Sequence, residues 1–266
     1  MSPLILHCAD SQLTVSPFGA QALSWQVAGQ ERLWLSLDAD LDGHHPIRGG
    51  VPLCFPWFGK APQGPSHGFA RTRLWQVAEQ SQTDDHAHLV LSLEQDADTE
   101  ALWPHPFRAE MAFTLKANAL QLALTVTNPG SAPLSYTAAL HSYLCTDVAQ
   151  LRITELAGLP YHDKLSNADC LFEDGPDAAL PPIPVDAIVP GLSNCRLAQG
   201  NDILEIDNQG HDAAVIWNPG PDHGIGDVHF GGEQAFICIE SAHALTPITL
   251  APGQRHTLSQ TLTVNT

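Results

Sequence analysis

The sequence predicts an all-β fold, a large antiparallel sandwich or a barrel-like double sheet. Many short segments alternate apolar and polar residues with a period of two, and turn residues separate these segments. No window of helical length carries apolar residues at a period of about 3.6 residues. Strands without crossover helices between them pair antiparallel, which favours two packed sheets. No short internal repeat is present, which disfavours a propeller or a β-helix.

Seven segments show the alternation of a strand with one buried face. The expected strands span residues 12–16, 22–27, 88–93, 111–115, 120–127, 150–156 and 257–264. In chain order, the apolar positions that recur every second residue are Leu13 and Val15, then Leu23, Trp25 and Val27, then Leu89, Leu91 and Leu93, then Met111, Phe113 and Leu115, then Leu120, Leu122, Leu124 and Val126, then Leu151 and Ile153, and last Leu258, Leu262 and Val264.

Turn residues mark the ends of these segments. The signals are Ala28-Gly, Asn128-Pro-Gly, Asn208-Gln-Gly and Pro252-Gly. The Pro-rich segment 176–190 is the best candidate for a domain boundary, but it is short and its apolar residues fit a packed loop. We therefore interpret it as a loop inside a single domain that spans residues 1–266.

The charge balance argues against two classes of partner. The 11 basic and 29 acidic residues give a formal net charge of −18, which repels nucleic acid and anionic membranes. A small anionic ligand remains compatible, because a local cluster of arginines can outweigh distant negative charge. The N-terminal segment has no basic region followed by a long apolar stretch, and no stretch approaches about 18 consecutive apolar residues. We expect a soluble, cytoplasmic protein.

Cysteine and histidine spacing predicts no metal site. The six cysteines lie far apart without a CxxC pair, which favours reduced thiols over a disulfide framework or a zinc site. Neither His44-His45 nor His86-Ala-His88 has a further ligand at a recognised metal spacing. No Walker loop, nucleophile elbow or dinucleotide fingerprint is present. We therefore expect the protein to use neither a metal nor a cofactor.

The segment from Arg48 to Arg71 has the composition of a binding site. It combines two arginines and His67 with glycines that permit close backbone approach and prolines that stiffen the turns. Two guanidinium groups in an acidic chain suit the bidentate capture of a phosphate or carboxylate, although two structural ion pairs are the alternative. Lys60, a lone lysine in the same segment, is expected to be solvated.

A histidine and a glutamate each follow an apolar run. His141 ends the strand-like run that starts at Tyr136, and Glu240 closes the run that starts at Phe236. A buried carboxylate is costly unless it is paired or its proton affinity is used, so Glu240 is a candidate functional group. His141 alone fits a core histidine or an acid. At two strand ends beside the arginine loop, the two could form a general acid and a general base, the pair that opening a sugar hemiacetal requires.

At these residues the chain resembles the aldose 1-epimerase superfamily, and within it the hexose-6-phosphate branch. The resemblance spans nearly the whole chain and implies a β-supersandwich of the galactose mutarotase type. It rests on these motifs, in this order: Arg48-Gly-Gly-Val-Pro, Phe55-Pro-Trp-Phe-Gly, His67-Gly-Phe-Ala-Arg71, Leu140-His-Ser-Tyr, Trp217-Asn-Pro and Cys238-Ile-Glu.

The resemblance implies a role for each matching residue. His141 corresponds to the general acid and Glu240 to the general base. Arg48 and Arg71 match the arginines at the phosphate end of the sugar pocket, and His67 matches a second histidine near the ring oxygen.

Further positions are similar to the family with departures. Asp186 is similar to an aspartate that binds sugar hydroxyls, although the family usually follows it with arginine and Ala187 stands here. The loop after Trp217-Asn-Pro also departs from related sequences. Phe55, Trp57 and Phe69 could stack on a sugar face or pack in the core.

The resemblance implies interconversion of the α and β anomers of a hexose 6-phosphate, with glucose 6-phosphate as the expected substrate, by acid–base ring opening and reclosure. It also favours a monomer. A mutarotase of unphosphorylated aldoses and a catalytically inactive carbohydrate-binding sandwich remain the alternatives.

Overall fold

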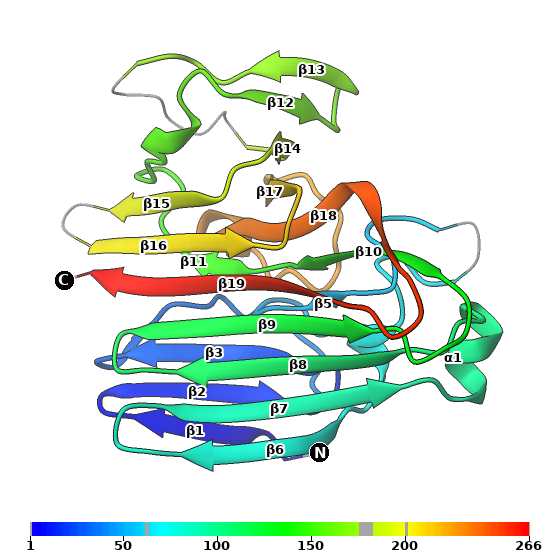
Figure 1. The fold of residues 1–266 in the computed structure, drawn as a ribbon. Helices are drawn as coiled ribbons and strands as arrows, with labels where there is room; N and C mark the ends of the chain where they lie inside the picture. Colours follow the sequence, from blue (N-terminus) through cyan, green and yellow to red (C-terminus); the bar gives the residue numbers. More distant parts are fainter. Residues whose placement is uncertain (1, 62–63, 176–182, 200–201, 266) are drawn as a thin grey trace.

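The computed structural model describes residues 2–61, 64–175, 183–199 and 202–265, and most of them lie in antiparallel sheets (Figure 1). The all-β prediction is therefore confirmed. Within these residues no helix is long and apolar enough to cross a bilayer. All six cysteines are free. The single-domain interpretation stays a prediction.

Two sheets supply most of the framework, and in both of them some neighbouring strands are not consecutive along the chain (Figure 1). The seven-stranded sheet has the order β15 (Asn194–Gln199), β16 (Asp202–Gln209), β19 (Arg255–Asn265), β9 (Ala119–Thr127), β8 (Arg108–Leu115), β7 (Ala87–Glu94) and β6 (Gln76–Gln82). The eight-stranded sheet has the order β13 (Ala168–Leu171), β12 (Pro160–Asp163), β14 (Val185–Pro190), β17 (Ala213–Asn218), β18 (Phe236–Leu250), β10 (Leu134–Leu140) and β5 (Leu53–Cys54), with β11 (Tyr143–Cys145) paired to β18.

A smaller sheet and a few short helices complete the described structure. The four-stranded sheet has the order β1 (Leu4–Cys8), β2 (Ser11–Ser16), β3 (Gln21–Val27) and β4 (Gln30–Glu31). The α-helix α1 (Ala97–Leu102) has only six residues and begins at a capping box, in which the Asp96 side chain accepts a hydrogen bond from the Thr99 backbone. The 3₁₀ helices are Ala70–Thr72, Thr154–Leu156 and Gly232–Gln234.

Most of the expected strands are confirmed. Six of the seven lie within β2, β3, β7, β8, β9 and β19, and their alternate residues are buried as the pattern predicts. Three of the four turn signals fall between consecutive strands. Of Asn208-Gln-Gly only Gly210 lies between strands, because Asn208 and Gln209 are the last two residues of β16.

The expected strand at 150–156 is wrong. Only Arg152 forms a β-bridge, to Ala198, and the segment then turns into a 3₁₀ helix at Thr154. The alternation of Leu151 and Ile153 did report burial, because both side chains are almost fully buried. A period of two over so few residues could not distinguish a paired strand from an extended loop that crosses the core.

The Pro-rich segment 176–190 is not a loop throughout. Val185–Pro190 is strand β14, which lies inside the eight-stranded sheet and pairs with β12 and β17. The prolines misled the prediction because Pro184 precedes the strand and Pro190 is its last residue, so none lies in the interior of the strand. Residues 176–182 lie outside the described residues.

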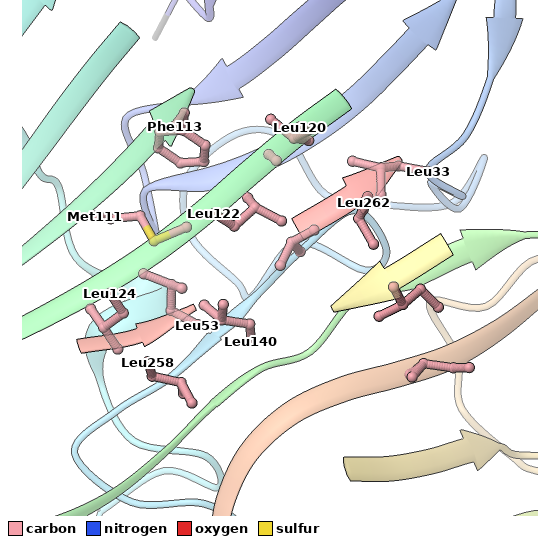
Figure 2. Close-up of a cluster of buried hydrophobic side chains, with 14 of the residues drawn as sticks. Leu33, Leu53, Met111, Phe113, Leu120, Leu122, Leu124, Leu140, Leu258 and Leu262 are labelled. Atoms are coloured by element: carbon pink, nitrogen blue, oxygen red, sulfur yellow. The ribbon is translucent and has the colours of Figure 1, made fainter. Parts of the chain in front are cut away.

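Buried side chains of all three sheets form one large cluster. Figure 2 shows part of this cluster, where Leu122 and Leu124 of β9 lie near Leu53 of β5 and Leu140 of β10. These residues come from the seven-stranded and the eight-stranded sheets, so the core joins the inner faces of the two. The other face of the eight-stranded sheet is therefore available for a site.

We predict that Leu122→Ala lowers the free energy of unfolding by about 2–5 kcal/mol, because Leu122 is fully buried and the change leaves a cavity. Urea denaturation followed by circular dichroism measures this loss. Leu171→Ala is the matched control, since Leu171 is 70% exposed and its loss should stay below about 0.5 kcal/mol. Equal losses would contradict the assigned core.

Candidate functional site

The central strands of the eight-stranded sheet carry polar groups on the face away from the core. In β18, Ile237 and Ile239 belong to the large core cluster, whereas Phe236 and Cys238 belong to a smaller cluster on the other face. Because side chains alternate along a strand, Glu240 lies on the same face as Phe236 and Cys238. All residues from Phe236 to Ala242 are buried, so both faces of this strand are covered.

The position of Glu240 corrects one prediction. Glu240 does not end a strand, because β18 continues to Leu250. Burial changes along this strand: every residue up to Ala242 is buried, and several residues beyond Ala242 are exposed. The apolar run detected by sequence is the part that is covered on both faces. His141, by contrast, directly follows the last residue of β10, as expected.

Glu240 and His141 contact each other inside the protein. The Nε2 atom of His141 lies 3.2 Å from Oε1 of Glu240. The two residues are only 8% and 1% exposed. The remaining polar atoms, Nδ1 of His141 and Oε2 of Glu240, are buried without a hydrogen-bond partner among the described residues. These atoms are therefore available to hydrogen-bond a molecule bound in the site.

Burial sets the protonation of this pair. It raises the pKa of the Glu240 carboxyl well above its usual range and lowers the pKa of the His141 imidazole. The neighbouring His67 ring, Arg48 and Arg71 lower the pKa of His141 further. The positive charges of the two guanidinium groups oppose an imidazolium. Both directions favour uncharged groups. In the uncharged form the pair holds one proton, on the carboxyl of Glu240, and its net charge is zero.

The loop between Arg48 and Arg71 is held close to the sheet by its backbone. Gly68 has a φ of +76°, and a Cβ atom there would collide with the carbonyl oxygen of Phe55. His67, next to it, also has a left-handed backbone, with a φ of +63°. The backbone N of His67 donates to Gly59 O at 2.7 Å. Glycine is required at position 68, so this part of the motif has a steric reason.

The same loop fixes which nitrogen of His67 carries a proton. The backbone N–H of Gly59 donates to Nδ1 of His67 at 3.3 Å, and Sγ of Cys54 lies 3.3 Å from the same atom. An N–H group can only donate, so Nδ1 is unprotonated and Nε2 carries the hydrogen. Burial lowers the pKa of His67 to about 4, and the positive charges of Arg71, Lys164 and Arg48 add to that effect. His67 is thus a neutral donor through Nε2.

The two arginines of the loop differ in their partners. Arg48 donates from Nε to Asp227 at 3.0 Å and from Nη1 to the Tyr143 hydroxyl at 2.8 Å. Burial opposes its charge, but these two partners outweigh burial and raise its pKa. Arg71 donates from Nη2 to the Ser66 carbonyl at 2.7 Å, and within the described chain it forms no ion pair and its buried Nε has no partner. The alternative of two structural ion pairs is correct for Arg48 only.

Asp186 is paired with a lysine that the sequence did not single out. Nζ of Lys164 lies 2.9 Å from each carboxylate oxygen of Asp186. Asp186 and Trp217 are register partners in β14 and β17. Ala187, the position where related sequences carry arginine, is fully buried on the core face of β14. The sequence did not indicate a role for Lys164, because a lysine in the turn between β12 and β13 resembles any solvated turn residue.

All six residues singled out from the sequence line one cavity of about 340 Å³. Further lining residues are Phe58, Ser66, Lys164, Val215, Trp217 and Ile225. Two larger hollows, of about 420 and 640 Å³, contain none of the six. Among the described residues no group of three His, Cys, Asp or Glu side chains could hold a metal ion.

Two aromatic side chains that the sequence analysis did not consider for stacking on a sugar line this cavity. Phe58 and Trp217 line it, whereas Phe55 and Phe69 are buried in the core and Trp57 packs against the core. The core alternative is thus correct for all three aromatic residues considered from the sequence. Phe58 and Trp217 were missed because the motifs alone do not show which face of the backbone each side chain occupies.

The loop after Trp217-Asn-Pro reaches the same cavity. Ile225 of this loop lines it, and Asp227 of the same loop holds Arg48. Val228 packs in the small cluster with Trp34 and Tyr143. The departure from related sequences noted above therefore falls on residues that border the cavity.

Comparison with known proteins gives consistent matches. The family model described as aldose 1-epimerase matches residues 4–263. The protein named "Putative glucose-6-phosphate 1-epimerase" of Escherichia coli (strain K12) is 34% identical over 236 residues, which cover 85% of this chain and 78% of that protein. A protein of the same name from Salmonella typhimurium (strain LT2) is 32% identical over 257 residues, which cover 92% of this chain and 84% of the relative.

Solved structures share the fold. The crystal structure of a "putative mutarotase" from Salmonella typhimurium has a TM-score of 0.89 at 27% identity, covering 98% of this chain and 90% of that one. A "Putative aldose 1-epimerase" from Escherichia coli K12 has a TM-score of 0.75 at 19% identity, covering 99% of each chain, and this likeness concerns the fold alone. The expected galactose mutarotase-like supersandwich is confirmed.

We predict that His67 stays a neutral imidazole with its hydrogen on Nε2 from about pH 7 down to about pH 5, since its pKa lies near 4. Long-range ¹H–¹⁵N NMR of the histidine rings measures both the charge and the tautomer, and His67→Gln identifies the signal. An imidazolium spectrum already at about pH 6, or a hydrogen on Nδ1, would contradict the hydrogen-bond assignment.

Proposed function

The chain belongs to the aldose 1-epimerase family, and from this premise we propose that it interconverts the α and β anomers of a hexose 6-phosphate, most closely glucose 6-phosphate. One observation carries the proposal: the buried, contacting pair of His141 and Glu240 shares a cavity with Arg71, a cation without an ion-pair partner among the described residues. The pair suits proton transfer, and the arginine suits a phosphate.

The pair can move two protons in one ring opening. Glu240, as a carboxylate, accepts the proton of the C1 hydroxyl, and His141, as an imidazolium, donates a proton to the ring oxygen. The bond between C1 and the ring oxygen breaks, its electron pair goes to the ring oxygen, and the C1 oxygen becomes an aldehyde carbonyl. Rotation about C1–C2 presents the other face, and the reverse transfers close the ring with C1 inverted.

The number of protons on the pair stays the same during ring opening. Before ring opening the pair is a carboxylate and an imidazolium, and afterwards it is a carboxylic acid and a neutral imidazole. Each state holds one proton on the pair. The second state is the uncharged form that burial favours, and it is the one required to close the ring. The 3.2 Å contact connects the two forms without an outside proton source.

Arg71 is the proposed phosphate ligand. Its charge is not compensated by a carboxylate within the described residues, and burial lowers its pKa, so an anion close to it would be favourable. Arg48, whose charge Asp227 already compensates, has less to gain from a dianion. We assign to Arg48 the orientation of the substrate, together with His67 and Asp186, whose donor and acceptor atoms suit sugar oxygens.

The other two interpretations are separated by substrate and turnover. A mutarotase of free aldoses would use the same acid and base but would gain nothing from Arg71. A carbohydrate-binding protein would retain affinity without proton transfer. Anomer exchange measured by magnetisation-transfer NMR, on glucose 6-phosphate and glucose in parallel, distinguishes all three once the spontaneous exchange in water is subtracted.

We predict that Glu240→Gln reduces the enzymatic rate of anomer exchange of glucose 6-phosphate by about 10²–10⁴-fold, because an amide cannot accept the C1 hydroxyl proton. The amide has nearly the same shape and needs no charge in its buried place, so the variant should fold. Near-UV circular dichroism checks the fold. A folded variant that keeps the wild-type rate would refute the assigned base.

We predict that Arg71→Met raises KM for glucose 6-phosphate by about 10–100-fold, since a charge-assisted hydrogen bond to phosphate is lost, and that it changes KM for glucose much less. Arg73→Met is the matched control. Arg73 lies two residues beyond Arg71, pairs with Asp98 and does not line the cavity. Equal effects of Arg71→Met on both sugars would contradict the phosphate assignment.

A further inference from the structure

Lys164 enters the cavity from a part of the chain that carries no recognised motif. It lies in the turn between β12 and β13, the hairpin at one edge of the eight-stranded sheet (Figure 1). Its side chain lines the same cavity as His141 and Glu240. The hairpin is joined to the rest of the sheet through β14, the strand that carries Asp186.

Three hydrogen bonds connect Lys164 to Asp186. The ammonium donates to both carboxylate oxygens at 2.9 Å, and the backbone N of Lys164 donates to the backbone O of Asp186, also at 2.9 Å. Nζ also lies 5.6 Å from the centre of the Phe58 ring, on which a cation is favourable. Because the ammonium contacts both oxygens at the same distance, it restricts the rotation of the Asp186 carboxylate, whose side chain is 17% exposed.

Lys164 and Glu240 line the same cavity, so the positive charge of Lys164 favours the carboxylate form of Glu240. Burial is the main reason that the pKa of Glu240 is raised; Lys164 lowers this pKa and Asp186 raises it. The β17 residues beside Glu240, Val215 and Trp217, carry no charge. The ionisable groups around the cavity come from several elements: Cys54 of β5, His141 after β10, Tyr143 of β11, Lys164 after β12, Asp186 of β14, Cys238 of β18, and Arg48, His67 and Arg71 of the loop.

We propose that Lys164 is a positioning residue of this site: it holds the Asp186 carboxylate in place and supplies the positive charge that favours the proton-accepting form of Glu240. This inference rests on the proposed function only for its consequence in catalysis. The electrostatic part concerns the resting protein and can be measured without any substrate. Lys164 is 38% exposed, so solvent weakens its field and a modest effect is expected.

The direct test titrates the Glu240 carboxyl in protein labelled with ¹³C at the glutamate side-chain carboxyl, with Glu240→Gln identifying the signal. Removing a positive charge disfavours a carboxylate, so Lys164→Met should move the titration midpoint to higher pH by about half a pH unit, a threefold change. Asp186→Asn removes a negative charge and should move it to lower pH. Lys164→Arg should stay near the wild type.

Lys60→Met is the matched control, because Lys60 is exposed and does not line the cavity. It should leave the midpoint unchanged. Opposite shifts for the two test variants support the proposal, and Lys164→Gln replaces Lys164→Met if that variant does not fold. Unchanged midpoints in both, or shifts equal to that of Lys60→Met, would overturn it.

A second readout tests the catalytic consequence. In Lys164→Met the acidic limb of kcat/KM for glucose 6-phosphate should move to higher pH, with about a threefold loss on that limb, and Lys164→Arg should restore it. If the wild type shows no anomer exchange, the proposed function fails, while the carboxyl titration still decides the role of Lys164. If the wild type is active but the limb does not move in Lys164→Met, the proposal about Lys164 is wrong.

Discussion

A carboxyl group and an imidazole buried in contact with each other are the constraint on which this site depends. Removing either group from water is costly when it is charged, so the pair is stable when it holds one proton in total. Glu240 lies in a part of β18 that is covered on both faces, and His141 directly follows the neighbouring strand β10. The register of these two strands therefore sets both the distance between the groups and their protonation.

Three further positive side chains lie around this pair, and two of them form ion pairs with aspartates. Arg48 is compensated by Asp227, and Lys164 by Asp186, so each contributes mainly orientation and a screened field. Arg71 differs, because among the described residues no carboxylate pairs with it. One uncompensated arginine in a chain with a net charge of −18 is a local exception that suits a small anion. The core between the two large sheets keeps this arrangement rigid, since the site occupies the opposite face of the eight-stranded sheet.

Sequence reasoning reached the fold class and the six cavity residues but missed several of their neighbours. Strong alternation in β8, β9 and β19 reported true strands because one face of each is buried. It failed at 150–156, where burial occurs without strand pairing, and at β14, where prolines conceal a central strand. Lys164, Asp227 and Phe58 lie far from the recognised motifs or on an undetermined side of them. Such partners depend on register and loop path, which local pattern does not encode.

The central claim is that activity requires exactly one proton on the pair of His141 and Glu240. The pH dependence of kcat/KM for anomer exchange of glucose 6-phosphate, from about pH 5 to about pH 9 and corrected for spontaneous exchange, tests it most directly. We expect a plateau in the middle of this range and a fall of the rate beyond it on each side, because burial lowers the pKa of His141 and raises that of Glu240 and so widens the pH range in which the pair holds one proton. A rate that rises or falls steadily across this range, or no acceleration at any pH, would contradict it.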